Sequence, residues 1–367
     1  MEWIGFGLGV ALLVVTFASV LDALVVPRGS PARFALTVTR GAGVVVRGLA
    51  RLFRSYEARD RVLVLHGPLS LLLVLIAWLG LLVLAFGLLA WPLGEPHGLA
   101  ESIRFSGSSL FTLGFAPASG PGPTTVAFLA AGSGMVVIAL QIAYLPTIYG
   151  AFNRRETLVT LLESRAGVPA WGPELLWRHQ RVGIFDSLPA LYAQWETWAA
   201  DVAETHATYP VLVYFRSPHP LRSWVTSLLA VLDAAALHLA LAPSTAPSEA
   251  RLCLRMGFTS VRDLARVLGI PHDGDPAPDA PLALTAAEFV EAVEVLRDIG
   301  FPAERSAEAA WADFRGWRVN YESVVHALGD LVTAPPALWS GPRRLVNEAP
   351  MPVRRPVDRR PDGAGNP

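Results

Sequence analysis

The sequence predicts an all-α membrane protein with an apolar N-terminal part and a soluble, helix-rich part after it. Of its 367 residues, 52% are hydrophobic and only 17% are charged, whereas soluble domains carry about 25% charged residues. Nearly all of the long apolar runs precede Gly150, and the rest of the chain has the mixed composition of a soluble protein. The two parts are therefore expected to contact different solvents.

Charge and cysteine content exclude several classes of function. The formal net charge of −1 gives no reason to expect nucleic acid as a partner. Cys253 is the single cysteine, so neither an intrachain disulfide nor a cysteine-rich metal site can form, and a reducing cytosolic environment is expected. His179, His206, His219 and His238 lack the spacing of metal ligands. No cofactor is expected.

Three segments have the length and apolar character of membrane-spanning helices, which need about 20 residues. They cover residues 3–26, 67–91 and 125–152. The first could be a signal peptide, but it has Glu2 in place of a basic region and is too long for the apolar part of such a peptide. It is therefore interpreted as a true span.

The distribution of arginine predicts the orientation, because basic loops stay in the cytoplasm. The loop between the first and second spans contains eight arginines: Arg28, Arg33, Arg40, Arg47, Arg51, Arg54, Arg59 and Arg61. Arg104 is the one basic residue between the second and third spans, and Arg154, Arg155 and Arg165 follow the third. A multi-pass protein of the cell inner (plasma) membrane is predicted, with its N-terminus outside and its C-terminal region in the cytoplasm.

Two further segments allow two interpretations each. Residues 33–54 alternate arginines with apolar residues, which favours an amphipathic helix on the inner leaflet over a solvated basic loop. Residues 224–242 are nearly long enough to span the bilayer, but Asp233 and His238 would then lie in hydrocarbon, where ionisable groups are costly. A buried helix of the soluble part is therefore preferred for this segment.

The region between the second and third spans is too short to cross the membrane. It contains a helix-compatible stretch, residues 99–111, then an extended piece with glycine, then a return rich in proline and glycine. Non-helical backbone at membrane depth is tolerated only where protein buries it or where it lines a path for water. A re-entrant segment is therefore predicted, with an ordinary apolar loop as the alternative.

The string SLFTLGFA at residues 109–116 resembles the filter pattern T-x-x-T-x-G-Y-G of the potassium-channel superfamily. The resemblance covers residues 67–152, about a quarter of the chain, and includes an outer helix, a pore helix, a filter and an inner helix. It implies a channel rather than an enzyme, with K⁺ or Na⁺ as the permeating ion. Because one chain supplies one filter segment and a closed ring needs four, it also implies a homotetramer in the lipid bilayer.

The resemblance assigns roles to individual residues. In such a filter, backbone carbonyls and a threonine hydroxyl replace the hydration shell of the ion. The pore helix would include Ser108 and Ser109, and the filter would consist of Thr112, Leu113, Gly114, Phe115 and Ala116. Two positions depart from the pattern, because Ala116 replaces the second filter glycine and Pro117 replaces an acidic residue. Alanine in left-handed backbone costs about 1 kcal/mol or more, and Pro117 restricts Ala116 toward extended backbone. The outermost ion site is therefore expected to be altered.

The third span would be the inner helix. Gly132 and Gly134 are candidates for a hinge, although small residues also serve close helix packing. Pro146 is expected to kink the helix near its inner end. Gln141 is expected to face a water-filled cavity or, alternatively, to bond a neighbouring helix.

The soluble part is expected to consist of helices and a tail. Helices are predicted at residues 154–166, 173–207, 219–242, 247–269, 285–299 and 303–332, and the Pro/Arg-rich tail at 335–367 is expected to be disordered. The domains would be residues 1–65 (first span and linker), 66–153 (pore), 154–334 (cytoplasmic helices) and the tail. The aromatic set Trp171, Trp177, Trp195, Trp198, Trp224, Trp311 and Trp317 favours core packing over a ligand cage.

Three functions remain in competition. The first is a tetrameric channel for potassium or, with weak selectivity, for monovalent cations. The second is a non-conducting membrane receptor or scaffold with a degenerate pore. The third and weakest is a membrane-anchored enzyme: Asp186, Glu196, Asp233 and Glu322 are candidate acids, but no spacing fixes their geometry.

Overall fold

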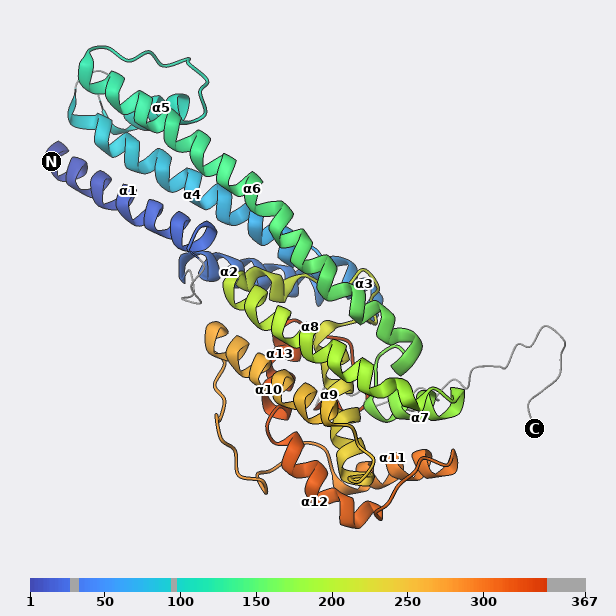
Figure 1. The fold of residues 1–367 in the computed structure, drawn as a ribbon. Helices are drawn as coiled ribbons and strands as arrows, with labels where there is room; N and C mark the ends of the chain where they lie inside the picture. The colour runs from blue at the N-terminus through green and yellow to red at the C-terminus, as the bar shows by residue number, and fades with distance from the viewer. Residues whose placement is uncertain (27–32, 94–97, 342–367) are drawn as a thin grey trace. The chain divides into compact units, whose positions relative to one another are not determined.

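The computed structural model describes residues 1–26, 33–93 and 98–341, and every regular element there is a helix (Figure 1). The expected all-α class is thus confirmed. The chain forms two compact units: unit 1 is Met1–Leu158, Thr197–Pro220 and Thr259–His272, and unit 2 is Val159–Glu196, Leu221–Phe258 and Asp273–Pro367. These units differ from the linear division expected near residue 153, because the chain returns to unit 1 twice.

Unit 1 begins with the apolar helices and the basic linker. Its elements are α1 (Glu2–Leu24), α2 (Arg33–Ala50), α3 (Tyr56–Leu63), α4 (His66–Ala90), η1 (Trp91–Leu93), α5 (Leu99–Leu110) and the first part of α6 (Pro121–Ala166). It also holds the end of α8 (Leu188–Thr208), η3 (Pro210–Tyr214) and the end of α10 (Ser248–Leu268). α4 packs against α1, α2 and α5.

Four stretches in the described part of the chain are long and apolar enough to cross a membrane: α1, residues 56–93, α6 and α9 (Trp224–Leu241). α1 covers residues 3–24 of the first expected span, and residues 56–93 and α6 contain the second and third. α6 is a single helix of 46 residues that includes Pro146. It ends at Ala166, well beyond the end expected at residue 152. Every residue of α9 is buried within the protein, as preferred for this segment on the basis of sequence.

The core of unit 1 joins α1, α4, α5 and α6. Its buried side chains include Val20, Trp78, Phe86, Phe105, Leu110 and Val137. α2 is amphipathic, as predicted for residues 33–54, and buries Leu36, Ala42 and Val46 while Val44 and Val45 remain exposed. The basic linker is therefore anchored to the apolar helices by one face of α2.

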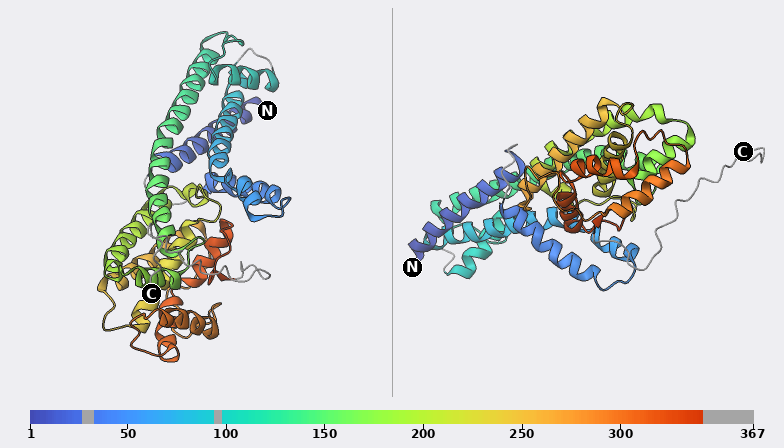
Figure 2. Two further views of the ribbon diagram at one scale, coloured as in Figure 1. Left: turned by 90° about the vertical axis from the view of Figure 1, so that its right-hand side faces the viewer. Right: turned by 90° about the horizontal axis from the view of Figure 1, so that it is seen from below.

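Unit 2 contains α7 (Gly172–Val182), η2 (Phe185–Ser187), the first part of α8, α9, most of α10, α11 (Ala286–Asp298), α12 (Ala307–Arg318) and α13 (Glu322–Leu331). The single helix expected at 173–207 is broken, because Gly183 adopts left-handed backbone (φ 74°) and ends α7. The helix expected at 303–332 is likewise divided into α12 and α13. Figure 2 gives two further views of these helices.

A buried ionic network centres on α9 in unit 2. Arg318 is fully buried and donates to Asp233 (2.6 Å), to Glu322 (2.8 Å) and to the backbone carbonyl of Trp339 (2.6 Å). The hydroxyl of Tyr321 donates to the other Asp233 oxygen at 2.8 Å. Two of the four candidate acids, Asp233 and Glu322, therefore meet at one buried arginine.

The packing of Trp339 shows that the chain is still ordered at residue 339, beyond the expected start of the disordered tail at residue 335. Its side chain is buried, and it packs against Trp171 and Phe314. Residues 335–341 thus belong to the core of unit 2, and the rest of the expected tail, residues 342–367, lies outside the described residues. Trp177, Trp195, Trp198 and Trp224 are buried and the other three candidate tryptophans are partly buried, in keeping with core packing.

Candidate functional site

The candidate site is the segment between α4 and α6, and it starts with the docking of α5 on α4 (Figure 1). Gly87 allows this approach, because a Cβ there would lie 3.0 Å from Cγ1 of Ile103. One turn further along α5, the hydroxyl of Ser106 donates to the carbonyl of Val83 at 2.8 Å. Both contacts use the C-terminal half of α4, so α5 runs back along α4 rather than away from it.

The C-terminal end of α5 lies against α6. Leu110, the last residue of α5, is 1% exposed, and a Cβ on Gly134 would overlap its carbonyl oxygen. Gly134 is thirteen residues beyond Pro121, the first residue of α6, which places it about 20 Å along the helix. The end of α5 therefore contacts α6 well inside the long apolar helix and not at its first turn.

The chain turns sharply after α5. The N–H of Leu113 donates to the carbonyl of Ser108 at 2.8 Å, and the N–H of Thr112 donates to that of Ser109 at 3.0 Å. Thr112 and Gly114 adopt left-handed backbone, with φ of 55° and 72°. Glycine accepts this conformation readily, whereas threonine does so at a cost. The backbone strain of the segment is therefore concentrated at Thr112.

Ala116 differs from the expectation. It is not among the residues with positive φ, and its N–H donates to the hydroxyl of Ser108 at 3.2 Å. Left-handed strain at Ala116 is therefore absent, and its backbone agrees with the restriction toward extended angles that Pro117 imposes. Ser108 connects the end of α5 to the fifth residue of the expected filter.

Apolar side chains on this segment are exposed. Phe111, Leu113 and Phe115 are 45%, 62% and 52% exposed, and the guanidinium of Arg104 lies over the Phe115 ring at 5.4 Å. α6 has a continuous apolar stripe that is also exposed: Phe128, Met135, Val136 and Ile142. In unit 1 these surfaces have no intrachain core to cover them.

The structure separates the two candidate hinge glycines. Gly134 is the packing contact described above, whereas a Cβ at Gly132 would meet nothing within 4 Å. Gly132 is therefore free of packing constraints, which a hinge needs. Pro146 is exposed and lies inside α6, which continues as a helix on both sides of it.

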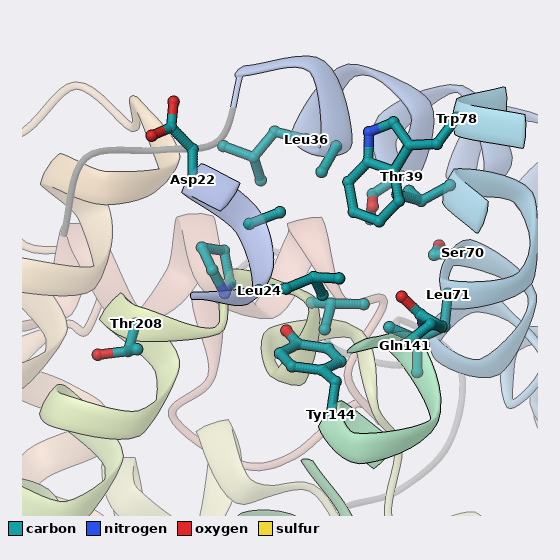
Figure 3. Close-up of a pocket in the computed structure, with 15 residues that line it drawn as sticks. Asp22, Leu24, Leu36, Thr39, Ser70, Leu71, Trp78, Gln141, Tyr144 and Thr208 are labelled. Carbon is teal, nitrogen blue, oxygen red and sulfur yellow. The ribbon is translucent and has the colours of Figure 1, made fainter. Parts of the chain in front are cut away.

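Gln141 faces a pocket inside unit 1 and not the exposed stripe of α6 (Figure 3). It is 6% exposed, and its Oε1 atom has no hydrogen-bond partner. The pocket is lined by residues of α1, α2, α4, α6, α8 and η3, and Ser70, Leu71 and Tyr144 lie near Gln141 in the close-up. This pocket lies between helices of one chain, so exposure of Gln141 to a water-filled pore cavity stays a prediction.

A buried arginine follows the apolar part of α6, and the sequence indicated a role for it in topology only. Arg155 is fully buried and donates to the carbonyls of Leu212 (2.9 Å) and Phe215 (2.6 Å). It also lies 3.0 Å from Nε2 of His206 and 2.9 Å from Glu156. Burial, and then the charge of Arg155, hold the pKa of His206 well below 6.5, so this imidazole is neutral.

Sequence reasoning missed Arg155, Ser70 and Tyr144 as members of a site. Each is a polar residue near one end of a long apolar segment. That position is the one signal in the sequence that could have identified them. Comparisons with protein-family models, curated proteins and solved structures found no match. A function for the chain is therefore inferred from its own residues.

Proposed function

We propose that unit 1 is the pore unit of a homotetrameric channel that conducts potassium or, with weak selectivity, monovalent cations. α1, α4 and α6 would cross the membrane with the N-terminus outside, and α9 would remain within the cytoplasmic part. The observation that carries the proposal is the depth of α5, whose last residue packs on Gly134 about 20 Å along α6. A helix that enters a transmembrane hairpin and turns back is the geometry of a pore loop.

The local chemistry favours cations. The C-terminal end of a helix carries partial negative charge, and this end of α5 would point toward the middle of the membrane. The next residues supply a threonine hydroxyl and left-handed backbone at Thr112 and Gly114. Left-handed backbone alternating with other conformations can align successive carbonyls toward one axis, where they replace the water around a cation.

The exposed apolar surfaces support a tetramer. Leu113 and Phe115 project from the filter segment, and the stripe from Phe128 to Ile142 follows α6. Four copies around one axis would let neighbouring chains cover these side chains and close a ring of carbonyls. The mass of the purified protein in nanodiscs should therefore be that of four chains, and a stable monomer or dimer would remove the pore interpretation.

Cation flux through liposomes containing the purified protein tests conduction. K⁺ efflux should depend on the protein and should fall in Thr112→Ala, which lacks the hydroxyl ring but keeps the backbone. Thr37→Ala is the matched control, because Thr37 is exposed on α2, far in sequence from the filter. Flux that is equal in wild type and Thr112→Ala would show that Thr112 does not line the ion path.

The alternative function is a non-conducting membrane receptor or scaffold. Ala116 and Pro117, which replace the glycine and the acidic residue of the potassium-channel pattern, favour it. In that case the pore helices would only hold four copies of unit 2 together. A tetramer by mass that shows no flux of K⁺ or Na⁺ would support the scaffold over the channel.

A further inference from the structure

The pocket beside Gln141 has apolar walls. Its lining includes Leu36, Leu71 and Trp78 (Figure 3), together with Val74. The indole N–H of Trp78 already donates to Ser19 at 3.1 Å, so its ring offers apolar surface. A ligand with an aliphatic portion could bury that portion here at a gain of about 25 cal/mol per Å².

One polar atom in this wall is unsatisfied. Gln141 is 6% exposed, and no group in the described part of the chain donates a hydrogen bond to its Oε1 atom. Leaving such an acceptor without a donor is unfavourable, because it has lost its hydrogen bond to water. Tyr144, one turn further along α6, also lines the pocket. The pocket therefore combines apolar walls with an acceptor that requires a donor.

The charges around the pocket restrict the donor. Among the lining residues in the described part of the chain, Asp22 alone carries a charge, and Figure 3 shows its carboxylate directed away from Gln141. A ligand anion would find no cation in the lining, and a ligand ammonium group would be desolvated without a buried counter-charge. An uncharged donor, a hydroxyl group, is the best match.

We propose that this pocket binds an uncharged amphiphile, a single aliphatic chain that ends in a hydroxyl group. The hydroxyl donates to Oε1 of Gln141, and the chain lies among Leu36, Leu71 and Val74. The ligand connects α2 and α4 with α6 just before Pro146. Binding depends on the pocket and not on conduction, so it holds for the channel and for the scaffold alike.

Photolabelling of the purified full-length protein tests the proposal. The probe is an eight-carbon alcohol that carries a diazirine, and labelled residues are identified by mass spectrometry. Labels are expected on pocket residues such as Leu71 and Val74. 1-Octanol should compete about fivefold better than its methyl ether at equal concentration in the detergent phase, because the ether cannot donate a hydrogen bond. Octanoate and octylammonium should compete less well than 1-octanol.

Three variants identify the contacts. Gln141→Leu should abolish the preference for the alcohol over the ether, whereas Ile142→Leu, a conservative change at the exposed neighbour, should keep it. Ala35→Phe should fill the pocket and remove the labels from Leu71 and Val74. Labels confined to exposed residues such as Leu72 and Ile76, or equal competition by the alcohol and its ether in the wild type, would overturn the proposal. Stronger competition by octanoate or octylammonium would overturn the uncharged class.

Discussion

Gly134 of α6 and the carbonyl oxygen of Leu110 at the end of α5 are so close that no side chain fits between them. This contact fixes how far α5 enters the hairpin of α4 and α6. It also determines where the chain turns, because the left-handed residues Thr112 and Gly114 follow within four positions. The position of the whole candidate site therefore depends on one glycine.

Gly134→Ala should be far more harmful than Gly132→Ala. The new methyl group at Gly134 would push α5 outward, at a cost of about 1–3 kcal/mol, and should lower both the apparent Tm and the K⁺ flux. Gly132 has open space around it, so its alanine variant should keep the wild-type Tm. Thermal unfolding in detergent measures both variants, and equal Tm values would contradict the packing role of Gly134.

Ser108→Ala should disturb the filter segment more than Ser109→Ala. The hydroxyl of Ser108 accepts the N–H of Ala116, and loss of such a bond costs about 1 kcal/mol. The potassium-to-sodium permeability ratio should therefore change in Ser108→Ala and stay unchanged in Ser109→Ala. Reversal potentials in bi-ionic potassium and sodium solutions provide the measurement, and the same ratio in both variants would count against the bond.

Ala116→Gly should leave the potassium-to-sodium permeability ratio nearly unchanged in the same reversal-potential measurement. Ala116 does not adopt positive φ, so glycine would relieve no left-handed strain there. A clear rise in selectivity would indicate that the conducting protein holds Ala116 in a left-handed conformation.

Acid should destabilise unit 1 through His206. Its folded-state pKa lies well below 6.5, so the unfolded chain binds a proton that the folded chain does not. The stability is complete above pH 6.5 and decreases below it, by about 2 kcal/mol at pH 5 if the folded protein stays neutral there. The apparent Tm should therefore decrease from pH 7 to pH 5. His206→Gln should flatten that slope and exposed His219→Gln should not, whereas parallel slopes in all three proteins would rule out His206.

The proposed topology predicts which residues are accessible from outside the cell. In a Cys253→Ala background, Ser119→Cys should react with an impermeant maleimide in intact cells. Arg181→Cys and Asp275→Cys, which are exposed positions before and after α9, should react only after permeabilisation. Opposite accessibility of positions 181 and 275 would mean that α9 crosses the membrane.

Much of the local structure could be predicted from the sequence. Long apolar runs predicted the positions of α1, α4, α6 and α9. A segment in apolar surroundings forms a helix because the helix makes all of its own backbone hydrogen bonds. The ionisable residues Asp233 and His238 predicted that α9 is buried within the protein, and α9 is buried. The sequence also predicted the helix before Thr112, although its end at Leu110 follows from capping bonds between residues 108 and 113.

Contacts between distant parts of the chain could be decided only by the tertiary structure. The sequence alone left Gly132 and Gly134 equivalent, and the position of Leu110 distinguishes them. From the sequence, Arg155 indicated only the orientation of the spans, yet it is buried and donates to carbonyls about 60 residues later. Burial and hydrogen bonding depend on which groups meet in space, whereas the amino-acid pattern reports only the preference of each segment for helix and for apolar or aqueous surroundings.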